Sequence, residues 1–407
     1  MWANSVATHT TTSDALPPPP DLIDIGATWR PHRSPEDHWR TVLLPHWQER
    51  CNEAETRFHV LAGVPRAVQA NLWWVSLVRH DLTSVEEWYR VAVDKAASWR
   101  AHLASGRDGR PQARDPCMED LLTIAADVPR TFIEQQQRGA LDAAALTHVL
   151  DAVVAADHDD VAAGNRPGCG YVQGMADVAA VLLLYEQAPC QAFGCLRSLS
   201  MRPLCRPILL LDMDLWSALG DVFERHLCSS LPKLAEHLTV LGLRPEFYLT
   251  EWLVPLWCRS LCPEASALTL NMLLLEGDLF LLRAALGVVS ALEPGLLACD
   301  DLSDCRALCS SGPRALSISE YRACIMRVAL ESHLLQPLAP WFEGVGADAG
   351  RSGAPPQPHC ALAGPAGKAA PSGWDEVSRD EPQLGPSPSF QKLLEVPDVL
   401  PDLISFS

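Results

Sequence analysis

Two side chains, Arg130 and Gln173, stand at predicted helix ends, where a polar group can be presented from a rigid frame. Gln173 lies between Gly170 and Gly174 in GYVQGM, where a glycine-rich loop turns into a predicted helix. Glycines let another backbone or a ligand come close. A carboxamide at this point could therefore be held out on a rigid helix start and used. The alternative is that Gln173 only caps or pads the turn.

Arg130 follows a segment that is predicted to be a helix because its apolar residues recur at helical spacing. The predicted buried face consists of Leu121, Ile124, Ala125 and Val128, and the residues predicted to lie off it are Asp120, Thr123 and Asp127. Pro129 disfavours helical geometry at Val128, so the helix should end there and place Arg130 and Thr131 on a loop. Asp127 is close enough in sequence to orient the guanidinium by a charge-assisted hydrogen bond. An isolated Asp–Arg pair, however, is more often a surface ion pair that contributes little.

The helix expected after Gly174 is predicted to bury one apolar stripe. Its members recur at helical spacing and are Met175, Val178, Ala179, Leu182 and Leu183. A preceding helix is expected from about Leu141 to Ala156, joined to the glycine loop by the polar segment HDDVAAGN.

The remaining periodicity is helical as well, and no run of alternating strands occurs, so the predicted fold class is all-α. Local signals mark several boundaries: Pro45 interrupts an early helix, Pro65 starts one, Ser230 to Pro232 starts another and Gly242 ends it. Ser317 and Glu320 form a predicted capping box. Mostly apolar helices are expected at residues 270–275 and 279–292.

Composition suggests one helical domain between tails. Residues 1–37 are polar with a run of four prolines, and we expect a disordered tail. The helical domain is predicted at residues 38–342. Residues 343–389 are rich in Gly, Ala, Pro and Ser, as in a flexible linker, and residues 390–407 form a short apolar C-terminal segment.

The formal charge of −18 argues against nucleic-acid binding, which needs a basic face. The 14 cysteines form no CxxC and no paired histidines stand at ligand spacing, so no metal site is predicted. Apolar runs such as Val178–Tyr185 are too short to span a bilayer, and no signal peptide opens the chain. We therefore expect a soluble cytosolic protein with reduced, mostly buried thiols. Cys169 and His148 raise the idea of a cysteine hydrolase, but no residue defines a base or an oxyanion site.

Three ordered segments resemble the TBC-domain family of Rab GTPase-activating proteins. They are Gly63-Val64-Pro65 followed by Leu72-Trp73, similar to G-[IV]-P…W; Ile124-x-x-Asp127-x-x-Arg130-Thr131, similar to I-x-x-D-x-x-R; and Tyr171-Val172-Gln173-Gly174-Met175, similar to Y-x-Q-G-M. The likeness covers roughly residues 55–300. It implies a multi-helix TBC domain whose partner is a GTP-bound Rab GTPase.

The resemblance also implies a mechanism and a set of roles. Arg130 would stabilise charge that develops on the transferred phosphoryl group, and Gln173 would orient the attacking water. Asp127 would aim Arg130, and the other supporting residues would be Thr131, Gly170, Tyr171, Gly174 and Met175. The chain has no P-loop of its own, so it would be an activator that supplies residues in trans. Magnesium and GTP would be carried by the GTPase, no cofactor is expected in this chain, and the protein would reach endomembranes through its partner.

Two positions depart from the family pattern. Gln69 stands where an arginine is usual, and Leu270-Asn271 stands where the family usually has Trp-Asp. The change at Gln69 predicts that an ion pair near the start of the domain is lost. The change at Asn271 predicts that the residue that usually pairs with the aspartate has a weaker partner. Both departures also favour an alternative function, a non-catalytic TBC-fold module that binds a Rab or another partner in membrane trafficking.

Overall fold

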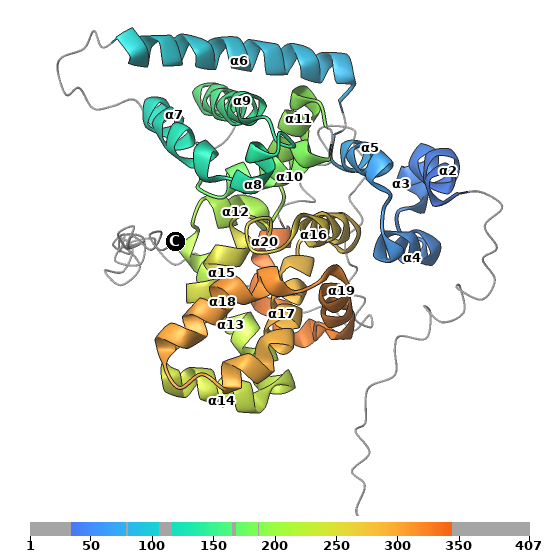
Figure 1. Cartoon of the computed structure of the whole chain (residues 1–407), viewed down its shortest axis with the longest axis vertical. Coiled ribbons are helices and arrows are strands. Elements are labelled where there is room, and N and C mark those ends of the chain that lie inside the picture. The colour runs from blue at the N-terminus through green and yellow to red at the C-terminus, as the bar shows by residue number, and fades with distance from the viewer. Residues whose placement is uncertain (1–33, 79, 106–115, 165–167, 186, 344–407) are drawn as a thin grey trace, which may run out of the picture. The chain divides into compact units, whose positions relative to one another are not determined.

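The computed structural model describes residues 34–343 apart from 79, 106–115, 165–167 and 186. All regular structure within these residues is helical, which confirms the all-α prediction (Figure 1). The described helices belong to one compact unit. The first of them, α2, begins at Pro35, within the last three residues of the predicted N-terminal tail. The predicted linker and C-terminal segment lie outside the described residues, apart from residue 343.

The chain up to the predicted glutamine contains short turns and five longer helices. In order these are α2 (Pro35–His38), η1 (Trp39–Leu43), η2 (Leu44–His46), α3 (Trp47–Arg50), α4 (Ala54–Ala62), α5 (Arg66–Leu77), α6 (Leu82–Ser105), α7 (Pro116–Asp127), η3 (Val128–Arg130), α8 (Ile133–Gln137) and α9 (Ala143–Ala162). The break of the early helix around Pro45 and the helix start after Pro65 are confirmed. The longest helix of the structure, α6, was not predicted from the sequence.

The remaining helices follow Gln173. They are α10 (Met175–Leu184), α11 (Pro189–Ser200), α12 (Cys205–Leu209), α13 (Met213–Ser230), α14 (Pro232–Leu241), α15 (Glu246–Leu253), α16 (Pro263–Glu276), α17 (Phe280–Leu297), α18 (Leu302–Ala315), α19 (Ile318–Arg327), η4 (Ser332–Leu338) and α20 (Pro340–Glu343). Gly242 ends α14 in a left-handed conformation, and the capping box of Ser317 and Glu320 starts α19, as predicted.

The helices pack as two groups that α16 connects. In the first group α9 contacts α6, α7, α10 and α11. In the second, α17 contacts α13, α14, α18 and α19. Helix α16 contacts α5 and α10 of the first group and α17 and α19 of the second (Figure 1). Because α10 contacts both α9 and α16, the loop that precedes α10 leads directly into the packed interior of the domain.

Helix α10 is more deeply buried than its predicted single stripe. Nine of its ten residues are buried, and the one that is not is Leu183, a member of the predicted stripe. Because α9, α11 and α16 all contact α10, it has almost no solvent face. The segment that leads to Gln173 is thus held by core packing on several sides.

Helix α9 is also longer than predicted. It continues through HDDV to Ala162, so the segment expected as a polar connection is helical. No helix breaker interrupts this segment before Gly164, and Asp157 is buried on the helix with a bonding role described below. This extension corrects the predicted end at Ala156.

Helix α17 corrects a prediction about apolar runs. It extends to Leu297 rather than residue 292, and its 18 residues are long and apolar enough to cross a membrane by length and composition alone. A core helix of a soluble protein passes the same test, and 61% of α17 is buried within the structure. Among the described residues no other helix meets this criterion.

The two departures from the family pattern meet in the interior. Gln69 of α5 and Asn271 of α16 are both buried. The Gln69 Nε2 donates to Asn271 Oδ1 at 2.6 Å, and Asn271 Nδ2 donates back to Gln69 Oε1 at 3.1 Å. Trp73 Nε1 also donates to Asn271 Oδ1, at 2.9 Å. A neutral amide pair therefore occupies both positions: the ion pair is absent, as predicted, and each amide has a hydrogen-bond partner.

Candidate functional site

Arg130 is held at the end of α7. The helix ends at Asp127, one residue before the predicted boundary, and Val128–Arg130 form the turn η3. Arg130 Nη2 donates to Asp127 Oδ1 at 2.7 Å, and its Nε donates to the Ala126 carbonyl at 3.1 Å. The Arg130 side chain remains 55% exposed. The structure thus presents a guanidinium at the surface while the residues behind it fix its direction.

Asp127 lies on the buried face of α7, which corrects the predicted pattern. Its side chain is buried, whereas Ala125, predicted to face the core, is exposed. A buried carboxylate is costly unless donors surround it. Here the donors come from Arg130 and, across the site, from the loop that carries Gln173.

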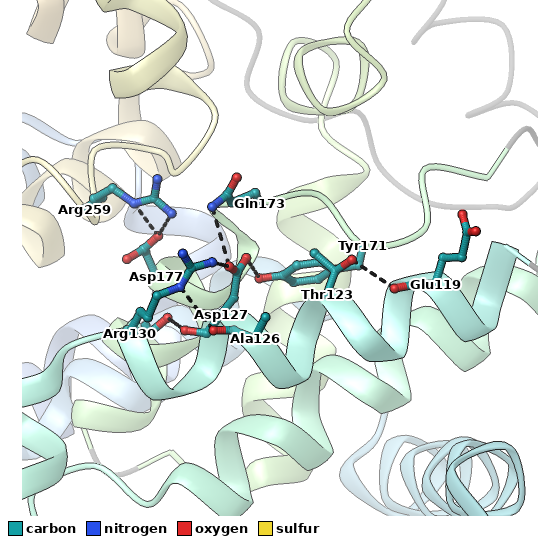
Figure 2. Close-up of polar contacts among 10 residues, drawn as sticks. Glu119, Thr123, Ala126, Asp127, Arg130, Tyr171, Gln173, Asp177 and Arg259 are labelled. Atoms are coloured by element: carbon teal, nitrogen blue, oxygen red, sulfur yellow. Dashed lines mark hydrogen bonds and ion pairs between the residues drawn. The ribbon is translucent and has the colours of Figure 1, made fainter. Parts of the chain in front are cut away.

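Both predicted functional side chains contact the same carboxylate. Tyr171 donates its hydroxyl to Asp127 Oδ2 at 2.9 Å, and Gln173 Nε2 lies 3.5 Å from Asp127 Oδ1, the oxygen that also accepts from Arg130 (Figure 2). Burial, and then the charge of Asp127, raise the pKa of the Tyr171 hydroxyl. Tyr171 therefore stays protonated and remains a donor. Gln173 itself is exposed.

The loop before Gln173 is anchored through its backbone. Asp157 Oδ2 accepts from the backbone N–H groups of Cys169 and Gly170, both at 2.9 Å. The Asp120 carboxylate accepts from the N–H of Tyr171. Two helices, α7 and α9, therefore hold three consecutive amides, and this fixes the approach to Gln173.

The conformation of the loop explains its two glycines. Gly170 has φ +56° and Gly174 has φ +117°, values that residues with a side chain rarely adopt. A Cβ on Gly170 would lie 2.4 Å from Asp120 Oδ2, and one on Gly174 would lie 3.3 Å from the backbone N of Pro255. The chain's own atoms occupy the space that these glycines leave open. At Gly174 the closely approaching group is another backbone, that of Pro255, which is one of the two options that the sequence offered.

The remaining supporting residues, Thr131 and Met175, act locally. Thr131 is buried, and its hydroxyl donates to the Asp127 carbonyl at 2.9 Å. Met175 Sδ accepts from the Val172 N–H at 3.3 Å, and the Met175 N–H donates to the Val172 carbonyl at 3.0 Å. Each residue tightens the turn next to one of the two exposed side chains. Phe132, which follows Thr131, adopts a left-handed φ of +49°, a conformation that costs energy in a residue with a side chain.

A second Asp–Arg pair borders the site and was missed in the sequence. Asp177 is buried in the first turn of α10, and its Oδ2 accepts from Arg259 Nε at 3.0 Å and Nη2 at 2.9 Å (Figure 2). Burial raises the pKa of the Asp177 carboxyl, and Arg259 opposes that shift. The one available signal was that Asp177 is the only charged residue in the apolar helix MADVAAVLLL. Arg259 gave no signal, because only tertiary packing brings it to α10.

The carboxylate beneath Gly170 gives a prediction about pH. Burial raises the pKa of Asp120 from 3.8 to about 6, although the N–H of Tyr171 partly opposes this. Because the pKa is higher in the folded state, this group's contribution to stability is complete below pH 4 and is lost as the pH rises through 6. The stability of Asp120→Asn relative to the wild type should therefore rise between pH 4 and pH 6 and stay constant above about pH 7. Urea unfolding at several pH values measures this difference. The exposed Asp221→Asn serves as the control, and a difference between Asp120→Asn and the wild type that does not change with pH would contradict the assignment.

Comparison with known proteins defines the class that this fold and site represent. Residues 96–297 match the family model of the Rab-GTPase-TBC domain. The chain is 25% identical over 302 residues to TBC1 domain family member 12 of Xenopus tropicalis and 26% identical over 301 residues to TBC1 domain family member 14 of Homo sapiens. Each alignment covers 72% of this chain and 42% of the relative, so the chain spans about two fifths of the length of these proteins.

A solved TBC domain has the same fold as this chain. The crystal structure of the Chlamydomonas flagellar RabGAP TBC domain superposes with a TM-score of 0.50 at 17% identity, covering 72% of this chain and 94% of that domain. Residues 96–297 form a domain of the Rab-GTPase-TBC family, and the chain is similar to TBC-domain proteins over 72% of its length.

Proposed function

We propose that this chain is a GTPase-activating protein for a Rab-family GTPase and that it inserts Arg130 and Gln173 next to the bound GTP. The observation that supports this most directly is the shared carboxylate of Asp127. It brings together two exposed polar side chains that are 43 positions apart in the sequence. An isolated surface ion pair needs no such arrangement, and a glutamine that only padded the turn would not reach across to α7.

The chemistry follows from what a GTPase lacks. During hydrolysis negative charge is spread over the phosphoryl oxygens, and the attacking water must be aligned with the bond that breaks. The guanidinium of Arg130 supplies positive charge and paired donors for these oxygens, and the carboxamide of Gln173 supplies a donor and an acceptor for the water. Magnesium and GTP come with the GTPase, and the chain reaches endomembranes from the cytosol through that partner.

The site is held in shape before the partner arrives. The loop amides are bound by Asp157 and Asp120, and the guanidinium by Asp127. Such preorganisation lowers the reorganisation required at the moment of reaction. Arg259 adds a second half-exposed guanidinium, which pairs with the buried Asp177 and offsets its negative charge.

Single-turnover GTP hydrolysis by a panel of purified Rab proteins tests the proposal. The full chain should accelerate hydrolysis by at least one Rab, in the presence of magnesium, with a rate that rises with its concentration. Binding to a GTP-loaded Rab without any acceleration across the panel would instead support the non-catalytic module. The neutral pair of Gln69 and Asn271 removes one reason for that alternative, because neither departure leaves a broken contact in the interior.

A further inference from the structure

Three metal-binding side chain types meet in the N-terminal part of the structure, outside the residues matched by the family model. His38 is the last residue of α2, and Glu55 and His59 lie on α4. Residues four apart on a helix share one face, so Glu55 and His59 point the same way. A ring contact brings His38 of α2 to that face, with the imidazole rings of His38 and His59 4.6 Å apart between centroids. Helices α2 and α4 are labelled in Figure 1.

The two imidazoles converge on one carboxylate oxygen. His38 Nε2 lies 3.6 Å from Glu55 Oε1, and His59 Nε2 lies 4.0 Å from the same atom. One ligand atom from each of the three residues lies within 4.8 Å of the others. Ligand atoms around a tetrahedral zinc ion with bonds of about 2.1 Å are about 3.4 Å apart. The three side chains are therefore close to a binding geometry and would need only small inward movements of their ends.

The surroundings hold the carboxylate in place and leave a route to solvent. Arg50 Nη2 donates to Glu55 Oε2 at 2.6 Å, so this oxygen is engaged and Oε1 faces the histidines. Outer hydrogen bonds of this type orient metal ligands in proteins. The side chains of His59 and His38 are 7% and 15% exposed, whereas Glu55 is 34% exposed. A metal ion can enter past Glu55 and is then shielded by the imidazoles.

We propose that His38, Glu55 and His59 form a site for a transition-metal dication, with zinc as the best-matched ion. Two imidazoles and one carboxylate suit zinc and other late first-row metals rather than magnesium or calcium, which prefer oxygen ligands. Three protein ligands leave at least one position for water. The positive charge of Arg50 weakens the attraction, so the affinity is lower than that of a closed site with four protein ligands. The bound ion cross-links α2 to α4, independently of the proposed catalytic residues.

The main competing explanation is a proton. A protonated imidazole would form an ion pair with Glu55 at these same distances and would need no metal. The two explanations differ in what stabilises the protein at pH 7.5: a neutral imidazole can bind a metal ion, whereas the ion pair needs a proton on the ring. Zinc would then raise the stability of the fold in a manner that depends on these three residues.

Cobalt(II) absorption and zinc-dependent thermal unfolding of the full chain at pH 7.5 test the site. The wild type should bind one more equivalent of cobalt than His38→Ala or Glu55→Gln, with the visible bands of nitrogen and oxygen ligation, and zinc should displace it. Either variant should weaken this binding at least 10-fold, the lower end of the loss seen when an outer-shell partner is removed. The zinc-induced rise in Tm should be lost with it.

His46→Ala is the matched control. His46 Nδ1 lies 3.6 Å from Glu49 Oε2, the same separation as in the proposed site, but its side chain is 59% exposed. Metal bound by cysteines would be the same in all variants and would cancel from the comparison. Glu55→Gln retains an acceptor for Arg50, so this variant should fold. It keeps the test informative even if removal of a histidine destabilises the protein. Equal cobalt binding and an equal zinc response in wild type, His38→Ala and Glu55→Gln would overturn the proposal.

Discussion

Arg130→Ala is expected to abolish nearly all of the acceleration of GTP hydrolysis by this protein. An arginine supplied in trans contributes about 10³–10⁵ in rate in GTPases of the Ras type. This corresponds to about 4–7 kcal/mol of the activation barrier. The cause is loss of a positive charge next to the phosphoryl oxygens, where no water can replace it. Arg130→Lys should recover little, because an ammonium group cannot reproduce the planar donor pair of a guanidinium.

The structure offers a closely matched control for this variant. Arg90 on α6 is 61% exposed and pairs with Glu87, three residues earlier, at 2.6 Å, much as Arg130 pairs with Asp127. Arg90→Ala should retain the wild-type rate. Arg90→Ala should unfold at nearly the wild-type denaturant concentration, since exposed ion pairs contribute little to stability. Arg130→Ala should lose some stability, because the buried Asp127 carboxylate keeps Tyr171 but loses its charged donor. A rate for Arg130→Ala that matches that of Arg90→Ala would show that Arg130 is not a catalytic finger.

Gln173→Ala should also slow hydrolysis, by about 10²-fold or more, the usual scale for removing one aligned polar group from a reaction centre. The double variant should be only slightly slower than Arg130→Ala, because residues that act as a unit are not additive. If Gln173→Ala kept the full rate while Arg130→Ala lost it, the water would be oriented by the GTPase itself. The two-finger proposal would then reduce to an arginine alone.

Asn271→Asp is expected to cause the largest loss of fold stability, on the order of 3–5 kcal/mol, the usual cost of an uncompensated buried charge. Asn271 donates to Gln69 and accepts from Gln69 and Trp73 within the interior. A carboxylate would keep the two donors but would place an oxygen against Gln69 Oε1, and both described hydrogen-bond partners of Asn271, Gln69 and Trp73, are neutral. The loss should grow as the pH rises and the buried acid ionises.

The double variant Gln69→Arg with Asn271→Asp should recover most of this loss. It places an arginine and an aspartate at the two positions where the family pattern has them, so the buried charges neutralise each other. Gln69→Arg alone should be destabilising for the same reason as Asn271→Asp alone. Urea unfolding of the wild type, the two single variants and the double variant gives their coupling energy. A double variant whose loss equals the sum of the two single losses would show that the positions do not act as a pair.

Local sequence signals predicted those parts of the site that depend on one or two neighbouring residues. Pro129 disfavours helical geometry before it, and α7 does end just ahead of it. Gly174 tolerates a positive φ, and α10 begins directly after it. The TBC-family resemblance, carried by short ordered motifs, was also available from the sequence and is confirmed by the comparisons.

Burial within helices was predicted less well because it depends on partners far away in the chain. Asp127 was placed off the buried face by its polarity, yet it is buried because Arg130 and Tyr171 donate to it. Asp157 follows the predicted helix end at Ala156, yet it lies on α9 and binds two amides of the next loop. A polar side chain is read as exposed from sequence, and only a folded structure supplies the donors that make its burial favourable.

By itself, the sequence determined the helical class, the positions of several helix ends, the family and the identity of the two candidate finger residues. Tertiary structure alone decided which groups meet: Arg130 with Gln173 on Asp127, Gln69 with Asn271, and His38 with Glu55 and His59. The physical reason is that helix propensity and capping act within a turn or two of the chain. Hydrogen bonds and ligand geometry depend instead on distances of a few ångströms between segments that only the packed core brings together.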